Sequence, residues 1–171
     1  MKKITGEIID CHIHPFISSE HSLYMFGQDV QPSEFVRTLK KAGISKCCGS
    51  VIDPSVTGKA CNFKHIRKLN REVLKFRDRY NDFFVPGVHI HPEFPDESCD
   101  ELDDMIKEGV KWVGELVQYI HGYKKYAIEK AFPVYKKISD ASMVLNVHPP
   151  ENPADIDELC TEFPDMKVVL A

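Results

Sequence analysis

The chain has 171 residues, of which 43% are hydrophobic and 28% are charged, a composition typical of one globular domain rather than of a disordered or fibrous chain. Its 22 basic and 26 acidic residues give a formal net charge of −4, which argues against a nucleic-acid partner bound through bulk positive charge. No apolar run exceeds four residues, and no apolar stretch follows the first two lysines. We therefore expect a cytoplasmic protein without a membrane span or a secretory signal.

Short runs rich in valine, isoleucine and aromatic residues alternate along the chain with segments of helical periodicity. For example, the spacing of Ile66, Leu69, Val73, Phe76 and Tyr80 lays one apolar stripe along a helix. In chain order we expect a strand at 7–14, a helix at 32–42, a strand at 46–53, a helix at 64–80, a strand at 83–91, a helix at 98–109, a strand at 110–119, a short helical turn at 126–130, a helix at 133–140, a strand at 143–148, a helix at 152–163 and a strand at 167–171.

This alternation is the pattern of a parallel sheet with helical crossovers. Two architectures have it, the doubly wound open sheet and the (β/α)8 barrel, and periodicity does not choose between them. The first strand ends in His12-Ile13-His14-Pro15 rather than in a Gly-x-Gly-x-x-Gly motif, so the sequence indicates no dinucleotide site there.

Histidines stand at the carboxyl ends of three expected strands, where both architectures place their active sites. His12 and His14 are two residues apart, so they face the same way on a strand and can offer two imidazoles to one metal ion. His148 ends the fifth strand, and of His89 and His91 on the third strand, the pattern leaves open which one points into the site. Such a site, completed by a carboxylate, suits zinc, or manganese or iron.

Glu115 is the candidate carboxylate, because it interrupts an otherwise apolar strand segment, Val113–Leu116. A buried carboxylate is costly unless it binds a metal or is paired. His21, His65 and His121 fall in loop or helical surroundings, and we expect them to be solvated. The cysteines form no Cys-x-x-Cys pair, so we expect six reduced thiols rather than a zinc–thiolate site.

The segments 8–15, 143–149 and 163–171 resemble the first, fifth and sixth strands of the amidohydrolase superfamily. Their form is similar to the amidohydrolase-related branch, which includes aminocarboxymuconate semialdehyde decarboxylase. Residues 86–92 and Gly114-Glu115 instead resemble the TatD-like nucleases, where a fourth-strand glutamate can bridge two metals. The resemblance implies a (β/α)8 TIM barrel with a divalent metal at its mouth.

In that resemblance, His12, His14 and His148 hold the metal, and Glu115 is a further ligand or a bridge, so that one or two ions are bound. His91 is the candidate to bind the charged group of a small-molecule substrate. Asp10 is expected to orient an imidazole from behind.

The superfamily also has a histidine at the end of the sixth strand and an aspartate, commonly the general base, on the eighth. The chain ends at Ala171, before both. We therefore expect residues 1–171 to be a single partial barrel domain, about five βα units plus the sixth strand, cut from a longer protein. Its first and sixth strands would be open edges, which makes a homo-oligomer an expected possibility.

The function indicated first is a metal-dependent hydrolase that uses metal-activated water on a small carbonyl, ester or amide substrate. Non-oxidative decarboxylation and TatD-like phosphodiester cleavage are alternatives within the enzyme class. A different alternative is a non-catalytic truncated barrel that binds metal or pairs through its open strand edges.

Overall fold

Six parallel strands form one sheet in the computed structural model, which describes residues 6–15, 30–52 and 62–171. The strands follow one another across the sheet in the order of the sequence. They are β1 (Ile9–Ile13), β2 (Lys46–Gly49), β3 (Phe84–Val88), β4 (Trp112–Leu116), β5 (Val144–Val147) and β6 (Lys167–Leu170). All five neighbouring pairs are parallel.

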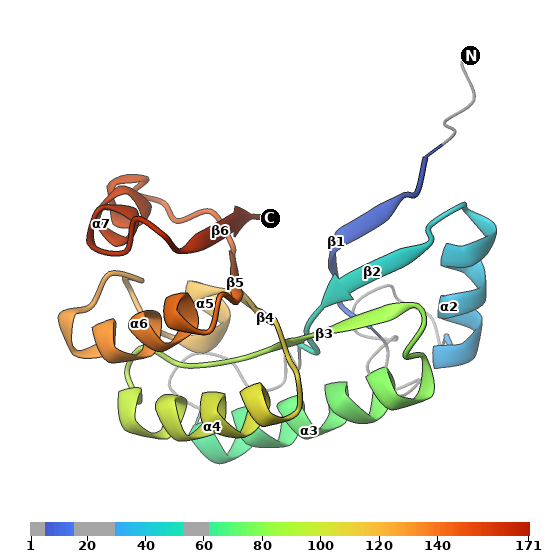
Figure 1. Cartoon of the computed structure of the whole chain (residues 1–171), viewed down its shortest axis with the longest axis horizontal. Coiled ribbons are helices and arrows are strands. Elements are labelled where there is room, and N and C mark those ends of the chain that lie inside the picture. The colour runs from blue at the N-terminus through green and yellow to red at the C-terminus, as the bar shows by residue number, and fades with distance from the viewer. Residues whose placement is uncertain (1–5, 16–29, 53–61) are drawn as a thin grey trace.

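The strand order decides between the two expected architectures. A doubly wound sheet reverses its strand order at a switch point, whereas here β1 to β6 run without a reversal. The sheet is also curved. This is evident from a hydrogen bond that Asn146 on β5 donates to the carbonyl of Cys11 on β1 (3.4 Å), although three strands lie between them in the sheet. Figure 1 shows this curved sheet with β1 and β6 at its two edges. The fold is half of a TIM barrel, as the sequence resemblance implied.

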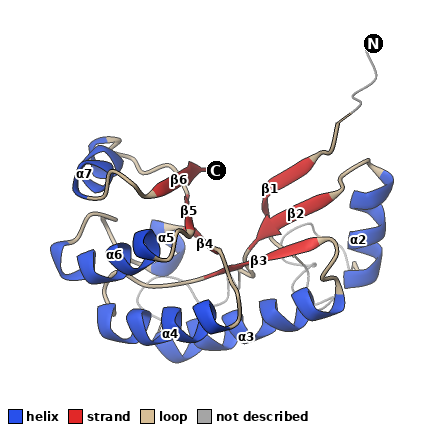
Figure 2. Cartoon of the chain, viewed as in Figure 1, coloured by secondary structure: helices blue, strands red, loops and turns tan. Residues whose placement is uncertain are grey.

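The helices lie on the outer side of the curved sheet (Figure 2). They are α2 (Pro32–Lys41), α3 (Phe63–Arg79), α4 (Pro95–Lys107), α5 (Gln118–His121), the 3-10 turn η2 (Glu129–Ala131), α6 (Phe132–Asp140) and α7 (Ala154–Glu162). The side chain of Asn62 caps α3 by accepting the backbone N–H of His65 (3.1 Å). Prolines occupy the first turns of α2, α4 and α6, where the missing N–H costs no hydrogen bond.

The main core lies between the sheet and this helical layer. The expected stripe of α3 contributes Leu69, Val73 and Phe76 to it, which are buried against the strands. Edge strands are less covered: Ile9 on β1 is 47% exposed and Leu170 on β6 is 56% exposed. Within the described ranges, no helix is long and apolar enough to cross a membrane.

Several predicted strands end earlier than expected: those at 46–53 and 83–91 end at Gly49 and Val88, and the fourth strand gives way to a helical turn. The strand expected at 110–119 ends at Leu116 and is followed by the single turn of α5. The backbone N–H groups of His121 and Gly122 bond back to the carbonyls of Val117 and Gln118 (3.0 and 2.8 Å). Gly122 then ends the turn at φ 81°, a conformation that glycine adopts at little cost. These local bonds outweigh the β propensity of the sequence.

The cysteines of the described segments carry free thiols, as expected. They are Cys11, Cys47, Cys48, Cys99 and Cys160, while Cys61 lies outside the described residues. Burial raises the pKa of Cys47 to about 12 and that of Cys48 to about 11. Both thiols therefore stay protonated, as small core hydrophobes do.

Gly87 on β3 permits a close approach of the neighbouring strands β2 and β4. A Cβ atom built at Gly87 would lie 2.3 Å from the carbonyl oxygen of Gly114 and 2.9 Å from that of Gly49. We expect Gly87→Ala to lower the free energy of unfolding by about 3 kcal/mol, the upper range for overpacking.

The matched control is Gly6→Ala, since nothing lies within 4 Å of a Cβ there. We expect it to change stability by less than about 0.5 kcal/mol. Urea denaturation of the two variants checks this pair. Equal stabilities would contradict the steric argument.

Candidate functional site

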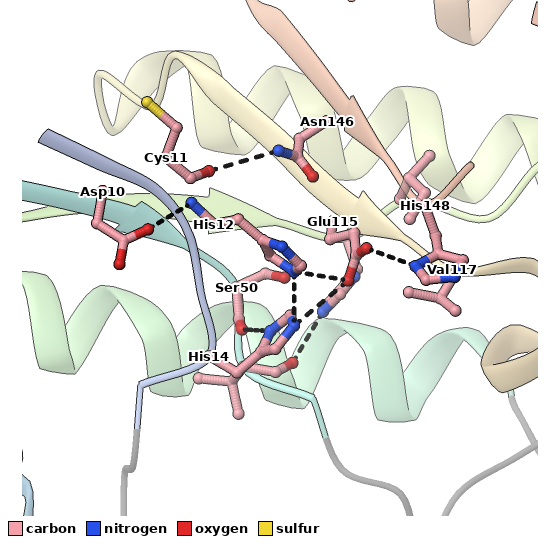
Figure 3. A network of polar contacts seen from close by, with 12 residues as sticks. Asp10, Cys11, His12, His14, Ser50, Glu115, Val117, Asn146 and His148 are labelled. Atoms are coloured by element: carbon pink, nitrogen blue, oxygen red, sulfur yellow. Dashed lines mark hydrogen bonds and ion pairs between the residues drawn. The ribbon is translucent and has the colours of Figure 1, made fainter. Parts of the chain in front are cut away.

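Four of the predicted site residues meet at the carboxyl ends of the strands. His12 is on β1, His14 follows that strand, Glu115 is on β4 and His148 follows β5. The Nε2 atoms of His12 and His14 lie 3.2 Å apart, and each faces Oε2 of Glu115, at 3.2 and 3.3 Å. Nδ1 of His148 contacts the other carboxylate oxygen, Oε1, at 3.0 Å. Figure 3 shows the three imidazoles pointing toward this one carboxylate.

The backbone sets the proton on one of these rings. Nδ1 of His14 lies 2.9 Å from the carbonyl oxygen of Ser50, just after β2. A carbonyl oxygen only accepts, so Nδ1 carries a proton. Nε2 therefore donates to Glu115 when the ring is protonated, and offers its lone pair to a metal ion when the ring is neutral. A carbonyl behind the ring is a common way to orient a metal-binding histidine.

The three facing atoms fit one divalent cation. The donor atoms of His12, His14 and Glu115 all lie within 4.8 Å of one another. Two donors bound about 2.1 Å from one ion, at about 90° to 109°, lie about 3.0 to 3.4 Å apart. The observed separations of 3.2, 3.2 and 3.3 Å fall in that range. Three electron-rich atoms this close need protons or a cation between them.

Glu115 is 4% exposed, and its ionised form is stabilised by its neighbours. Burial raises the pKa of this carboxyl, but the hydrogen bond with His14, the charge of His12 and the hydrogen bond with His148 together outweigh it, so the pKa is lowered. The carboxylate is therefore available as an anionic ligand at neutral pH. Its contacts with the three histidines offset the free-energy cost of burying a carboxylate in an apolar strand.

His148 is held in place by the ends of β4 and β5. Its backbone N–H donates to the carbonyl of Leu116 (2.9 Å). The hydroxyl of Tyr126 lies 2.8 Å from the same carbonyl and 2.9 Å from that of His148, and can donate to either. The ring of Tyr119 packs edge-on against the His148 ring at 5.4 Å. These contacts fix the imidazole beside Glu115.

A second group of histidines lies buried next to this cluster. Nε2 of His89 lies 2.8 Å from the carbonyl of Val51, and burial lowers the pKa of His89 to about 4. The prediction of a solvated His121 is wrong: it is 5% exposed because it packs against the rings of His89 and Tyr123. Burial and the neighbouring His89 lower the pKa of His121 to about 3.

His91, the predicted substrate-binding residue, is also buried. Its Nδ1 accepts the N–H of Glu93 (3.1 Å), and its Nε2 lies 2.9 Å from the carbonyl of His121. Burial lowers its pKa, so the ring is neutral at pH 7. A substrate would have to replace one of these two backbone bonds, and the substrate role of His91 stays a prediction.

The other sequence candidates take different places. Asp10 contacts the backbone rather than an imidazole: its Oδ1 accepts the N–H of His12 (3.0 Å). His65 is half-buried on α3 rather than solvated, and His21 lies outside the described residues. Asn70, which the sequence did not single out, brackets the backbone of His89 through its N–H and carbonyl (2.8 and 2.9 Å).

Some of the buried polar atoms without a hydrogen-bond partner lie on strands of the sheet or just after them. Among the described residues they include Oγ of Ser50, Nδ1 of His89 and Oδ1 of Asn146, which lie on or just after β2, β3 and β5. Such atoms are rare in cores and commonly mark positions for water, ions or ligands. In the sequence, these residues could have been recognised as hydrogen-bonding side chains at the ends of predicted strands.

Solved structures of decarboxylases share this fold. A 2,6-dihydroxybenzoate decarboxylase bound to 2,6-dihydroxybenzoate aligns with a TM-score of 0.66 and 16% identity over 97% of this chain and 67% of its own. A dihydroxybenzoic acid decarboxylase from Polaromonas sp. JS666, with manganese and the inhibitor 2-nitroresorcinol, aligns with a TM-score of 0.68 and 15% identity over 97% of this chain and 65% of its own.

A 5-carboxyvanillate decarboxylase from Novosphingobium aromaticivorans, also with manganese, aligns with a TM-score of 0.60 and 14% identity over 91% of this chain and 53% of its own. At these identities the likeness shows the fold. The chain spans between about half and two thirds of the lengths of these proteins.

No curated protein matches the sequence. The family model described as Amidohydrolase matches residues 9–171, nearly the whole chain. Its match includes every candidate ligand described above, from His12 to His148. The chain therefore belongs to the Amidohydrolase family.

Proposed function

We propose that the protein is part of a metal-dependent, non-oxidative decarboxylase of small aromatic carboxylic acids. The observation that carries this proposal is the convergence of His12, His14 and Glu115 on one point, with separations that suit a divalent ion. The family and the three decarboxylases that share the fold support it, since two of them contain manganese and two hold an aromatic acid.

The chain's own residues would hold the ion and shape its surroundings. His12, His14 and Glu115 supply two nitrogens and one oxygen, a mixed set that suits manganese or zinc. When bound, the ion supplies a Lewis acid that polarises substrate oxygen atoms. The carbonyl of Ser50 keeps His14 in the tautomer that a metal needs (2.9 Å). The second oxygen of Glu115 faces His148, so His148 would be the fourth residue available to hold a metal.

In the proposed reaction, the bond between the ring carbon and the carboxylate carbon breaks, CO2 leaves, and a proton takes its place on the ring. Decarboxylation of 2,6-dihydroxybenzoate thus gives CO2 and resorcinol, with one proton consumed. His89 and His121 are buried and neutral at pH 7, so they add no positive charge next to the cluster.

Hydrolysis by metal-activated water is the second candidate, because the same ligands serve it and the family model is described as Amidohydrolase. The two reactions differ in their products. Hydrolysis of an amide or ester adds water and releases an amine or alcohol, whereas decarboxylation releases CO2 and needs no added water.

The experiment supplies the protein with Mn²⁺ and follows resorcinol and CO2 formed from 2,6-dihydroxybenzoate by chromatography and a coupled CO2 assay. We expect release that disappears with EDTA, and at least a hundredfold slower release in Glu115→Gln, by analogy with losses of about 10²-fold or more for catalytic electrostatics. Metal-dependent ester or amide hydrolysis without CO2 would instead support the second candidate. Activity unaffected by EDTA would refute both.

A further inference from the structure

A pocket of about 750 Å³ opens beside His148. Its lining comes from the segments that follow β4 and β5, residues 118–125 and 148–155. Because His148 also contacts Glu115 (3.0 Å), the pocket shares one wall with the candidate metal cluster. A molecule in it would therefore lie next to the ligands.

Tyr119 gives this pocket an aromatic wall. It is 69% exposed, although its ring packs edge-on against His148 at 5.4 Å. Within the described residues, the other exposed large hydrophobic side chains are Ile9 and Leu170, which lie on the two edge strands of the sheet. Tyr119 has no such topological reason for exposure, and its free ring face suits stacking with a planar molecule.

Two lysines line the pocket, and their ammonium groups differ. Nζ of Lys125 lies 2.5 Å from a carboxylate oxygen of Glu158, and this hydrogen bond raises the pKa of Lys125. For Lys124, by contrast, the part of the chain that the structure describes offers no carboxylate within ion-pair distance. Lys124 is thus the pocket cation available to an anion.

The acidic residues that line the pocket, which all lie in the described segments, do not form an ion pair with Lys124. Asp155 is buried, and its two oxygens already accept the backbone N–H groups of Tyr126 and Ala127 (2.7 and 2.8 Å) and the amide of Gln118 (3.1 Å). The same Gln118 amide donates to the carbonyl of Lys124 (3.2 Å), so these bonds hold the Lys124 segment in place. Glu151 is exposed in the lining and is the residue that opposes an anion there.

We propose that this pocket is the substrate subsite, in which Lys124 pairs with the carboxylate of an aromatic acid and Tyr119 stacks against its ring. The assignment deepens the proposed function, on which it rests for the nature of the substrate. It adds the two residues that select the substrate's charge and shape.

The test measures binding without turnover, by calorimetric titration of the metal-free protein in EDTA with two probes, 2,6-dihydroxybenzoate and resorcinol. The probes share a ring and two hydroxyl groups, and only the first carries a carboxylate. We expect the wild type to prefer 2,6-dihydroxybenzoate. Lys124→Gln should weaken its binding about fivefold, the upper range for an exposed ion pair, and leave resorcinol binding unchanged. Lys124→Arg should keep the preference.

Lys125→Gln is the matched control, because it removes the same charge from the adjacent residue, whose partner is Glu158. We expect less than a twofold effect from it, and tighter binding of 2,6-dihydroxybenzoate in Glu151→Gln. Tyr119→Ala should weaken both probes together. An equal loss in the two lysine variants, an unchanged Lys124→Gln, or no binding of either probe by the wild type would overturn the assignment.

Binding and turnover separate this inference from the proposed function. Carboxylate binding that depends on Lys124, without metal-dependent CO2 release, would leave the subsite standing and remove the decarboxylase. CO2 release that is indifferent to Lys124 would do the opposite.

Discussion

Replacing His12 and His14 together with alanine is expected to lower the affinity for Zn²⁺ by about 10⁴-fold, which abolishes stoichiometric binding. Zinc sites with about four ligands contribute about 10–16 kcal/mol, or about 3 kcal/mol for each ligand, and the double variant removes two of the three atoms that converge here. Equilibrium dialysis with metal analysis measures the bound ion. One equivalent of metal retained by the double variant would refute the site.

A matched variant separates metal binding from folding. Removing both imidazoles leaves the buried Glu115 carboxylate with His148 as its remaining partner in the cluster, and an unpaired buried charge destabilises a protein. Adding Glu115→Gln to the double variant removes that charge. We expect the triple variant to regain stability in urea denaturation while still failing to bind zinc. Recovery of metal binding in the triple variant would contradict the ligand assignment.

Lowering the pH from 7 to 5 is expected to reduce the free energy of unfolding of the metal-free protein by about 4 kcal/mol. Burial lowers the pKa of His89 to about 4 and that of His121 to about 3, from an ordinary value of 6.5. Below pH 6.5 the unfolded chain binds protons at both residues and the folded chain does not, so stability falls by about 1.4 kcal/mol per pH unit for each.

This loss has a defined pH window. Above pH 6.5 the two histidines contribute no pH dependence, and below it the loss continues until the folded protein itself protonates, near pH 4 for His89 and near pH 3 for His121. Burial also lowers the pKa of His91, which adds to the loss below pH 6.5, and the lowered pKa of Glu115 adds a further loss only as the pH falls toward and below 4.5. Urea titrations at several pH values measure the slope. His121→Gln should remove about 1.4 kcal/mol per pH unit from the slope between pH 6 and 5, and a flat profile in the wild type would contradict the assignment.

Much of the candidate site is predictable from the sequence, because strand geometry is local. Residues two apart on a strand face the same way, which is why His12 and His14 meet. Parallel strands also place their carboxyl ends at one edge, which brings Glu115 and His148 to them from β4 and β5. Glu115 could be identified as the candidate carboxylate because burying its charge in an apolar strand costs free energy unless it is paired or binds a metal. These inferences need only periodicity and residue chemistry.

The environment of the other residues depends on contacts that no local pattern encodes. His121 is buried because the chain turns after Val117 and packs its ring on His89, 32 residues earlier in the sequence. Lys124 and Tyr119 line a pocket because Asp155, on α7, holds the segment after β4 through the N–H groups of Tyr126 and Ala127. From the sequence we instead expected a strand as far as residue 119 and a solvated His121, because these hydrogen bonds join residues far apart in the sequence.

The sequence by itself determined the alternation of strands and helices, the edge of the sheet that carries the site, and the ligand types gathered there, since all three follow from side-chain periodicity and chemistry. Periodicity left open the choice between an open doubly wound sheet and a barrel, because both share the same alternation and differ only in strand order and curvature. The resemblance of the strand segments implied the barrel, and the strand order of the tertiary structure confirms it. The same curvature brings β1 within reach of β4 and β5, and this approach turns three scattered side chains into one cluster.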